Sequence, residues 1–343
     1  MQPICRRANT IFTSFTRAYR CAILNEYKTP LQVQDVKHRD PGDHEILIST
    51  EFAGVNHADG CMLKGEYHLK PVVPFVPGFE AIGTITAAGK NVKNFNEGER
   101  VVVFKTGGVG GFSQRTIADE KTDIIVKLPF SIDAEVTPSL SAYCLAYVGM
   151  KRLVMENLGN SFLVLSARGT VGYAALDLAQ NVFEGLVFGA SDSEEKLSVL
   201  REANVNSTFN WTDGELARNV KHKTFGKGVD FVIDTVGGDV FDQGLQCLKE
   251  GGHYLSLGFS SGVFPKVNLL DLHRLNASIS GVWLSGRNRN EIKQAMDMVI
   301  KLFDDDFLSG IKIHQYKLED INQAFEDSQK PDFFGKAVIT LYD

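Results

Sequence analysis

The feature that most constrains the fold is a strand, a glycine turn and a helix that follow one another directly. Residues 162–179 read FLVLSARGTVGYAALDLA. The first four residues predict a buried strand, and the small or apolar side chains from Val171 to Leu178 recur on one helical face. Gly169 would let a pyrophosphate approach the backbone, and Gly172 would let the helix pack closely on the strand. The N–H groups of the first helical turn would then meet the phosphates.

A glycine pair of this kind also occurs in ordinary turns, so its context decides the interpretation. Further apolar runs, separated in several places by helical stretches, follow at residues 185–190, 229–236, 253–259 and 279–284. Repeated strand–helix–strand units of this type predict a parallel sheet with helices on both faces. We therefore expect a nucleotide-binding, doubly wound α/β domain.

The region before this domain has a different pattern. Short alternating β runs and glycine-rich turns fill residues 19–128, which predicts a barrel-like β domain. A chain of 343 residues is also long for one core. We predict that residues 19–138 and 302–343 form the β domain and that residues 139–301 form the nucleotide-binding domain. Helices are expected at about 131–158, 290–303 and 318–329, and a last strand at Ala337–Leu341 is expected to return to the β domain.

Charge is distributed unevenly along the chain. The formal net charge is −6, yet residues 1–20 contain four arginines and no acidic residue. This basic leader with several hydroxyl side chains is typical of a mitochondrial transit peptide, which we place at residues 1–18, and the alternative is a disordered basic tail. The acidic balance argues against nucleic-acid binding. No apolar run approaches the length of a membrane span.

Several short motifs, in a consistent order from about Tyr19 to the C terminus, resemble one enzyme family. They are AGVNHAD (53–59), GEY (65–67), VPFVPGFE (73–80), GERV (98–101), GGF (110–112), SEEKL (193–197), VIDTVGG (232–238) and GKAV (335–338). Together they resemble the zinc-free quinone oxidoreductase branch of the medium-chain dehydrogenases/reductases. The resemblance implies an α/β protein with a GroES-like, partly open β-barrel catalytic domain and a Rossmann domain with a doubly wound parallel sheet.

Two departures from the patterns of related enzymes bear on chemistry. Ser166 replaces the first alanine of the usual AxxGxxG turn, and Arg168 either reaches a phosphate or is a solvated turn residue. Phe79 stands where metal-dependent relatives have the histidine of a GHE segment, and the five cysteines form no CxxC pair. We therefore expect no metal, and we interpret His57 as a packed or pocket-lining residue rather than a ligand.

The residues after the second strand of the nucleotide domain bear on cofactor choice. An acidic residue roughly 20 positions beyond the glycine turn usually binds the ribose hydroxyls of NAD. Ser191 stands near that position, and Lys196 follows where the resemblance implies a phosphate-binding lysine. Asp192 argues for NADH if it points inward, and Lys196 is otherwise an exposed helix residue. We predict NADPH.

The remaining cofactor contacts follow from strand ends and from the resemblance. Val236 is expected on the adenosine or ribose side, and Lys336 either closes the cleft or is a surface lysine. The full predicted set is Ser166, Gly169, Thr170, Val171, Gly172, Ser191, Lys196, Val236, Gly258, Phe259, Ser260, Val282, Trp283 and Lys336.

The expected reaction is hydride transfer from NADPH to a quinone or a similar conjugated carbonyl. By motif position, Asn56 and Tyr67 are the candidate catalytic residues, and Tyr67 is alternatively an aromatic wall residue. Two other functions remain open: reduction of the C=C bond of an enone or enoyl thioester, and a non-enzymatic NADPH-binding protein that acts through interaction or RNA binding. By resemblance, we expect a homodimer through the edge strand at residues 279–284.

Overall fold

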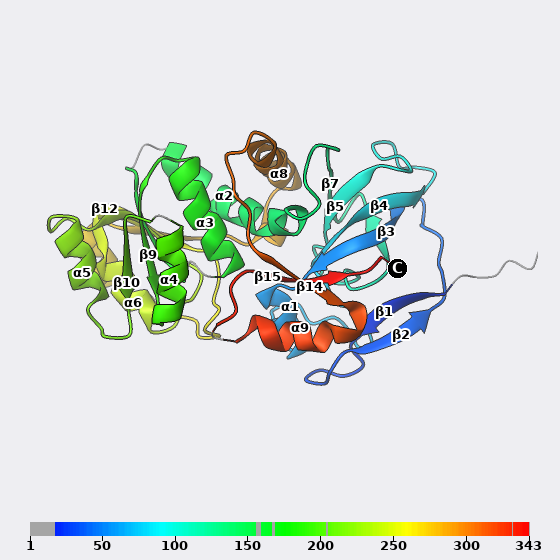
Figure 1. Ribbon diagram of the computed structural model, residues 1–343, viewed down its shortest axis with the longest axis horizontal. Coiled ribbons are helices and arrows are strands. Elements are labelled where there is room, and N and C mark those ends of the chain that lie inside the picture. Colours follow the sequence, from blue (N-terminus) through cyan, green and yellow to red (C-terminus); the bar gives the residue numbers. More distant parts are fainter. Residues whose placement is uncertain (1–17, 156–158, 167–168, 204, 331, 343) are drawn as a thin grey trace, which may run out of the picture.

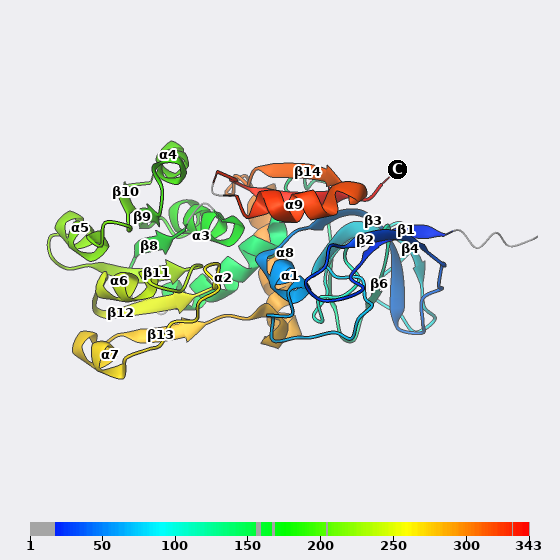
Figure 2. The same cartoon turned by 90° about the horizontal axis from the view of Figure 1, so that it is seen from below.

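The computed structural model describes residues 18–155, 159–166, 169–203, 205–330 and 332–342. Two bodies lie side by side along its longest axis, one built on a parallel sheet and the other on a mainly antiparallel sheet (Figures 1 and 2). The predicted leader at 1–18 falls almost wholly outside the described residues, and Arg168 lies outside them as well. No helix in the described part of the chain is long and apolar enough to cross a membrane.

The parallel sheet has six strands in the order β10-β9-β8-β11-β12-β13. The strands are β8 (Ser161–Leu165), β9 (Leu186–Ser191), β10 (Ser207–Asn210), β11 (Val229–Asp234), β12 (Leu248–Ser256) and β13 (Ser278–Gly281). Every neighbouring pair is parallel, so each connection must cross over the sheet. The predicted doubly wound fold is confirmed, although β10 was not expected and β12 begins earlier than predicted.

Helices cover both faces of this sheet. Successive side chains of β8 point to opposite faces, and both sets are buried against helices. Phe162 and Val164 belong to the apolar cluster that includes α2, α3 and α4, whereas Leu163 and Leu165 pack with α5 and α6 on the opposite face. Because both faces are buried, the strand is apolar throughout. The α-helices are α1 (His57–Leu63), α2 (Leu140–Met155), α3 (Thr170–Asn181), α4 (Glu194–Glu202), α5 (Leu216–Lys223), α6 (Val240–Gln246), α7 (Leu269–Leu275), α8 (Arg289–Asp304) and α9 (Ile321–Ser328).

The second sheet follows the order β14-β15-β3-β4-β5-β7, with β6 paired to β3. A separate antiparallel hairpin joins β1 and β2. The strands are β1 (Tyr19–Ile23), β2 (Gln32–Val36), β3 (Glu45–Gly54), β4 (Glu80–Ala88), β5 (Arg100–Phe104), β6 (Arg115–Asp119), β7 (Ile124–Lys127), β14 (Ile313–Lys317) and β15 (Lys336–Thr340). As predicted, the last strand returns to the N-terminal body, where β15 pairs antiparallel with β3.

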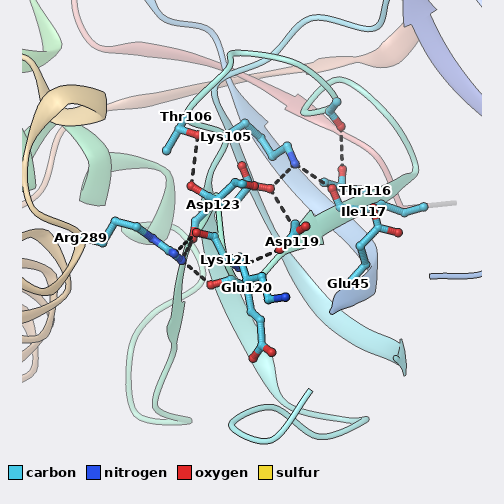
Figure 3. A network of polar contacts seen from close by, with 12 residues as sticks. Glu45, Lys105, Thr106, Thr116, Ile117, Asp119, Glu120, Lys121, Asp123 and Arg289 are labelled. Atoms are coloured by element: carbon cyan, nitrogen blue, oxygen red, sulfur yellow. Dashed lines mark hydrogen bonds and ion pairs between the residues drawn. The ribbon is translucent and has the colours of Figure 1, made fainter. Parts of the chain in front are cut away.

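The guanidinium of Arg289, at the N terminus of α8, is hydrogen-bonded to a turn of the second sheet. Arg289 donates hydrogen bonds to the main-chain carbonyls of Glu120, Lys121 and Asp123 in the turn between β6 and β7 (Figure 3). The Asp123 carboxylate is in turn paired with Lys105. Polar contacts of this kind restrict how the two bodies move relative to each other, because one side chain satisfies three carbonyls at once.

Candidate active site

The glycine turn after β8 has a geometry suited to a phosphate group. Ser166 has a positive φ of 55°, and its N–H donates to the Ala190 carbonyl at 2.9 Å. Gly169 caps α3 with an extended backbone. Among the described residues, a Cβ at Gly169 would meet only the Ser166 carbonyl oxygen, at 3.8 Å. This part of the chain therefore leaves the position open, which fits a ligand that approaches the helix N-terminus.

The other turn positions follow from this start of α3. Thr170 is its first residue, Val171 packs partly against the main apolar cluster, and Gly172 is buried in the first turn. A buried glycine at this place is consistent with close packing of the helix on the sheet.

The end of β9 carries a compact polar group. Ser191 is fully buried, and its hydroxyl donates to Asp192 Oδ1 at 3.3 Å. The Lys196 ammonium is paired with the same carboxylate oxygen, one helical turn further along. Burial alone would raise the pKa of Asp192, but the Lys196 ammonium and the Ser191 hydroxyl lower it below its ordinary value. Lys196 is thus close to Ser191, as its predicted role requires, and Asp192 holds it there.

A buried carboxylate organises the next strand end. Asp234 Oδ1 accepts the N–H groups of Val236 at 2.7 Å and Gly237 at 3.1 Å, and Oδ2 accepts the Tyr254 hydroxyl at 2.8 Å. Burial raises the pKa of Asp234 against these hydrogen bonds. The turn after β11 is therefore fixed by the fold, and it places Val236 at the carboxyl edge of the sheet.

The segment after β12 lies beside this turn. The Ser260 N–H donates to the Thr235 carbonyl at 3.0 Å, and a Cβ at Gly258 would lie 3.3 Å from the same oxygen. After β13, the Val282 N–H donates to the Ser256 carbonyl at 3.2 Å. The predicted contacts at 258–260 and 282–283 thus share one edge of the sheet with the glycine turn, where ligands of such folds bind.

On the barrel side, Asn56 is the cap residue of α1. Its N–H donates to Asp59 Oδ2 at 2.9 Å, and its side-chain amide donates to the Gly54 carbonyl at 3.2 Å. Asp59 Oδ1 accepts the Phe79 N–H at 3.1 Å. The capping pattern Asn-x-x-Asp is readable in the sequence, but we did not single out Asp59 for this role.

Asp59 is fully buried, which has an electrostatic consequence. Burial, with a smaller contribution from the nearby Glu80, raises the pKa of its carboxyl from 3.8 to about 7 against the opposing effect of the hydrogen bonds from Asn56 and Phe79. The Asp59 carboxyl, which accepts the Asn56 N–H, therefore titrates near neutral pH.

Aromatic residues from both bodies meet at Tyr67. Its ring lies edge-on to Phe79, with centroids 5.4 Å apart. The next residue, His68, lies edge-on to Trp283 at 4.5 Å. Burial raises the pKa of the Tyr67 phenol, and a hydrogen bond with the Trp283 side chain opposes this shift. Tyr67 is thus both part of an aromatic wall and a protonated phenol at neutral pH, next to Trp283.

His57 also joins the two bodies. Its Nε2 lies 3.3 Å from the Cys61 thiol, one turn along α1. Desolvation and the charge of Lys64 lower the pKa of His57, against a hydrogen bond to the Phe259 main chain. The prediction of a packed or pocket-lining histidine did not include its contact with Cys61, although the i, i+4 spacing on a predicted helix would have indicated it.

Lys336 is buried, so the alternative of a surface lysine is wrong. Its side chain is fully buried, and its ammonium lies 2.5 Å from Glu80 Oε1 and 2.9 Å from Ser141 Oγ. It is therefore not a surface lysine, because its charge is neutralised within the protein. Its predicted contact with a cofactor stays a prediction, and the partners that it has are Glu80 and Ser141.

The predicted residues thus fall into three groups. The glycine turn and the β9 end lie on the nucleotide side, Phe259 and Trp283 contact barrel residues, and Asn56 and Tyr67 belong to the start of α1 and to the loop after it. In the described ranges, no group of three or more His, Cys, Asp or Glu side chains is placed to hold a metal ion.

Comparison with known proteins gives a consistent result. The family described as alcohol dehydrogenase GroES-like domain matches residues 42–130, and the family described as zinc-binding dehydrogenase matches residues 170–301. Quinone oxidoreductase-like protein 2 of Rattus norvegicus is 32% identical, over 98% of this chain and 96% of its own length.

Solved structures have the same fold. A quinone oxidoreductase of Pseudomonas syringae superposes with a TM-score of 0.85 at 23% identity, over 94% of this chain and 99% of its own. A mycobacterial protein solved in complex with NADPH superposes with a TM-score of 0.84 at 24% identity, over the same shares of the two chains. With a Rossmann sheet, a GroES-like barrel and these relatives, the chain belongs to the zinc-free quinone oxidoreductase branch of the medium-chain dehydrogenase/reductase superfamily.

Proposed function

We propose that the protein is an NADPH-dependent reductase that transfers a hydride to a quinone or a similar conjugated carbonyl without a metal. The observation that carries the proposal is the meeting of the Tyr67 phenol with Trp283 at the carboxyl edge of the parallel sheet. This contact puts a protonated donor from the barrel at the edge where a dinucleotide binds in folds of this type. A structural neighbour was solved in complex with NADPH, which supports NADPH as the cofactor.

The nucleotide half of the proposal rests on the open glycine turn. The N–H groups at the start of α3 would bind the pyrophosphate, since no Cβ at Gly169 blocks it. Ser191 and Lys196 would bind the 2′-phosphate, with Lys196 turning from Asp192 toward the ligand. Asp192 lies beside Ser191 and Lys196 and would instead favour NADH. The preference between NADPH and NADH therefore depends on the balance between the Lys196 ammonium and the Asp192 carboxylate.

The acceptor half rests on Asn56 and Tyr67. NADPH, when bound, supplies the hydride from C4 of its nicotinamide. Negative charge that develops on the acceptor oxygen needs hydrogen-bond donors, and the Tyr67 phenol is one because burial keeps it protonated. The Asn56 amide keeps one N–H besides the one that Gly54 accepts. The two side chains would thus orient and stabilise the acceptor.

Reduction of a C=C bond in an enone or enoyl thioester is the second candidate. That reaction needs a proton donor as well as a hydride, and the protonated phenol of Tyr67 is a candidate donor. A non-enzymatic NADPH-binding protein is the remaining alternative.

Oxidation of NADPH, followed by its absorbance with quinones, enones and enoyl-CoA as acceptors, tests these functions. We expect the fastest turnover with a quinone, and a loss of about 100-fold or more in kcat for Tyr67→Phe. Faster turnover of enoyl-CoA would favour the second candidate. Tight NADPH binding without oxidation by any acceptor would refute both reductase proposals.

Two further proposals concern assembly and location. Among the described strands, β13 ends the parallel sheet and pairs with β12 alone, so it offers an edge for a second copy, and we propose a homodimer through it. We also propose a mitochondrial address in residues 1–18. Light scattering of purified protein tests the first, and the location of a fluorescent protein fused to residues 1–25 tests the second. A monomer or a diffuse cytosolic signal would refute them.

A further inference from the structure

Cys61 differs from the other cysteines that the structure describes. Cys21, Cys144 and Cys247 are fully buried, whereas Cys61 is partly exposed. It lies near the C-terminal end of α1, the helix that Asn56 caps. Its main-chain carbonyl accepts the N–H of Tyr67 at 3.2 Å, so the thiol belongs to the same wall as the proposed proton donor.

The thiol has a proton acceptor in place. Cys61 Sγ lies 3.3 Å from His57 Nε2. The hydrogen bond between His57 and the Phe259 main chain raises the pKa of the imidazole, which is the effect of a ring N–H that donates to a carbonyl. In the neutral tautomer that carries its proton on Nδ1, Nε2 accepts the S–H. Because desolvation lowers the pKa of His57, the ring is neutral at pH 7 and available as a base.

The charges around Cys61 and His57 do not convert the Cys61 thiol into a thiolate by themselves. Burial and Glu66 raise the pKa of the Cys61 thiol, and Lys64 opposes them. The resting state is therefore a thiol hydrogen-bonded to a neutral imidazole. Such a pair becomes nucleophilic when the imidazole takes the proton as a new bond to sulfur forms.

We propose that Cys61, with His57 as its base, is a covalent capture site for electrophilic conjugated carbonyls. This inference rests on the proposed function, which brings quinones and enones to this wall of the site. The Cys61 Sγ–C bond forms at the carbon β to the carbonyl, and the π electrons of the C=C bond move onto the carbonyl oxygen. The S–H proton passes to His57 Nε2 and then to the resulting enolate. No oxidant or reductant is consumed, and the reverse of the same steps releases the electrophile.

Methyl vinyl ketone, applied to the full chain without NADPH, tests the site. Peptide mapping by mass spectrometry reads the adduct on each cysteine separately over time. We expect Cys61 to react before Cys21, Cys144 and Cys247, and the rate at Cys61 to fall about tenfold in His57→Phe, since a positioned base typically contributes at least that much. His68→Phe is the matched control, because it removes a histidine from the same wall that pairs with Trp283 instead. It should leave the rate unchanged.

Equal rates at Cys61 in the parent and in His57→Phe, or no adduct on Cys61, would overturn the proposal. Circular dichroism of each variant establishes that it is folded. The labelling needs neither NADPH nor turnover, so an adduct without NADPH oxidation would refute the proposed reductase and keep the capture site. The opposite result would keep the reductase and remove the capture site.

Discussion

The buried ion pair between Lys336 and Glu80 gives a prediction whose magnitude follows from the structure. Lys336 Nζ lies 2.5 Å from Glu80 Oε1, and the two side chains are 0% and 2% exposed. Lys336→Met removes the ammonium and leaves a carboxylate in a site that water does not reach. Breaking a buried pair in this way costs about 3–5 kcal/mol of the free energy of unfolding, because the remaining charge stays desolvated.

Urea unfolding followed by tryptophan fluorescence measures this loss. The double variant Glu80→Gln/Lys336→Met should recover at least half of it, since an uncharged amide replaces the stranded carboxylate. Lys127→Met is the matched control: Lys127 Nζ lies 2.6 Å from Glu99 Oε1, but the Lys127 side chain is 48% exposed. We expect little change there, because water screens the pair.

A loss for Lys336→Met no larger than that for Lys127→Met would refute the reasoning. So would a double variant that is less stable than the single one, because the cost would then come from packing rather than from an unpaired charge. Either result would show that the loss of stability does not come from a buried, unpaired carboxylate.

Three further predictions concern the site. Lys196→Ala should weaken NADPH binding by about tenfold or more and leave NADH binding nearly unchanged, as measured by fluorescence titration; equal losses would remove its phosphate-binding role. Burial raises the pKa of Asp59 from 3.8 to about 7. Asp59 therefore ionises more readily in the unfolded state, and the folded state becomes progressively less stable as pH rises from about 4 to about 7. Asp59→Asn should flatten the dependence of the unfolding free energy on pH over that interval, and an unchanged slope would contradict the assignment. Trp283→Leu removes the partner of Tyr67 and His68, and we expect kcat to fall severalfold with NADPH affinity less affected; an unchanged kcat would exclude a positioning role.

Much of the nucleotide half was predictable because its signals are local. Four apolar residues before a glycine turn specify β8, and glycine at 169 and 172 specifies how close a ligand or a strand can approach. The short outer strands were harder to find. β14 (Ile313–Lys317) has no fully buried residue, so no run of apolar side chains indicates it, and its pairing with β15 sets its conformation.

The sequence by itself determined the order of the two sheets, the glycine turn and the family, since these depend on neighbouring residues. Only the tertiary structure decided the surroundings of Lys336, which is paired with a residue 256 positions away. The same holds for the meeting of Tyr67 with Trp283 and of His57 with Phe259. Burial and hydrogen bonds from the other body shift the pKa of Tyr67 and of His57, and these hydrogen bonds arise only when the two bodies come together.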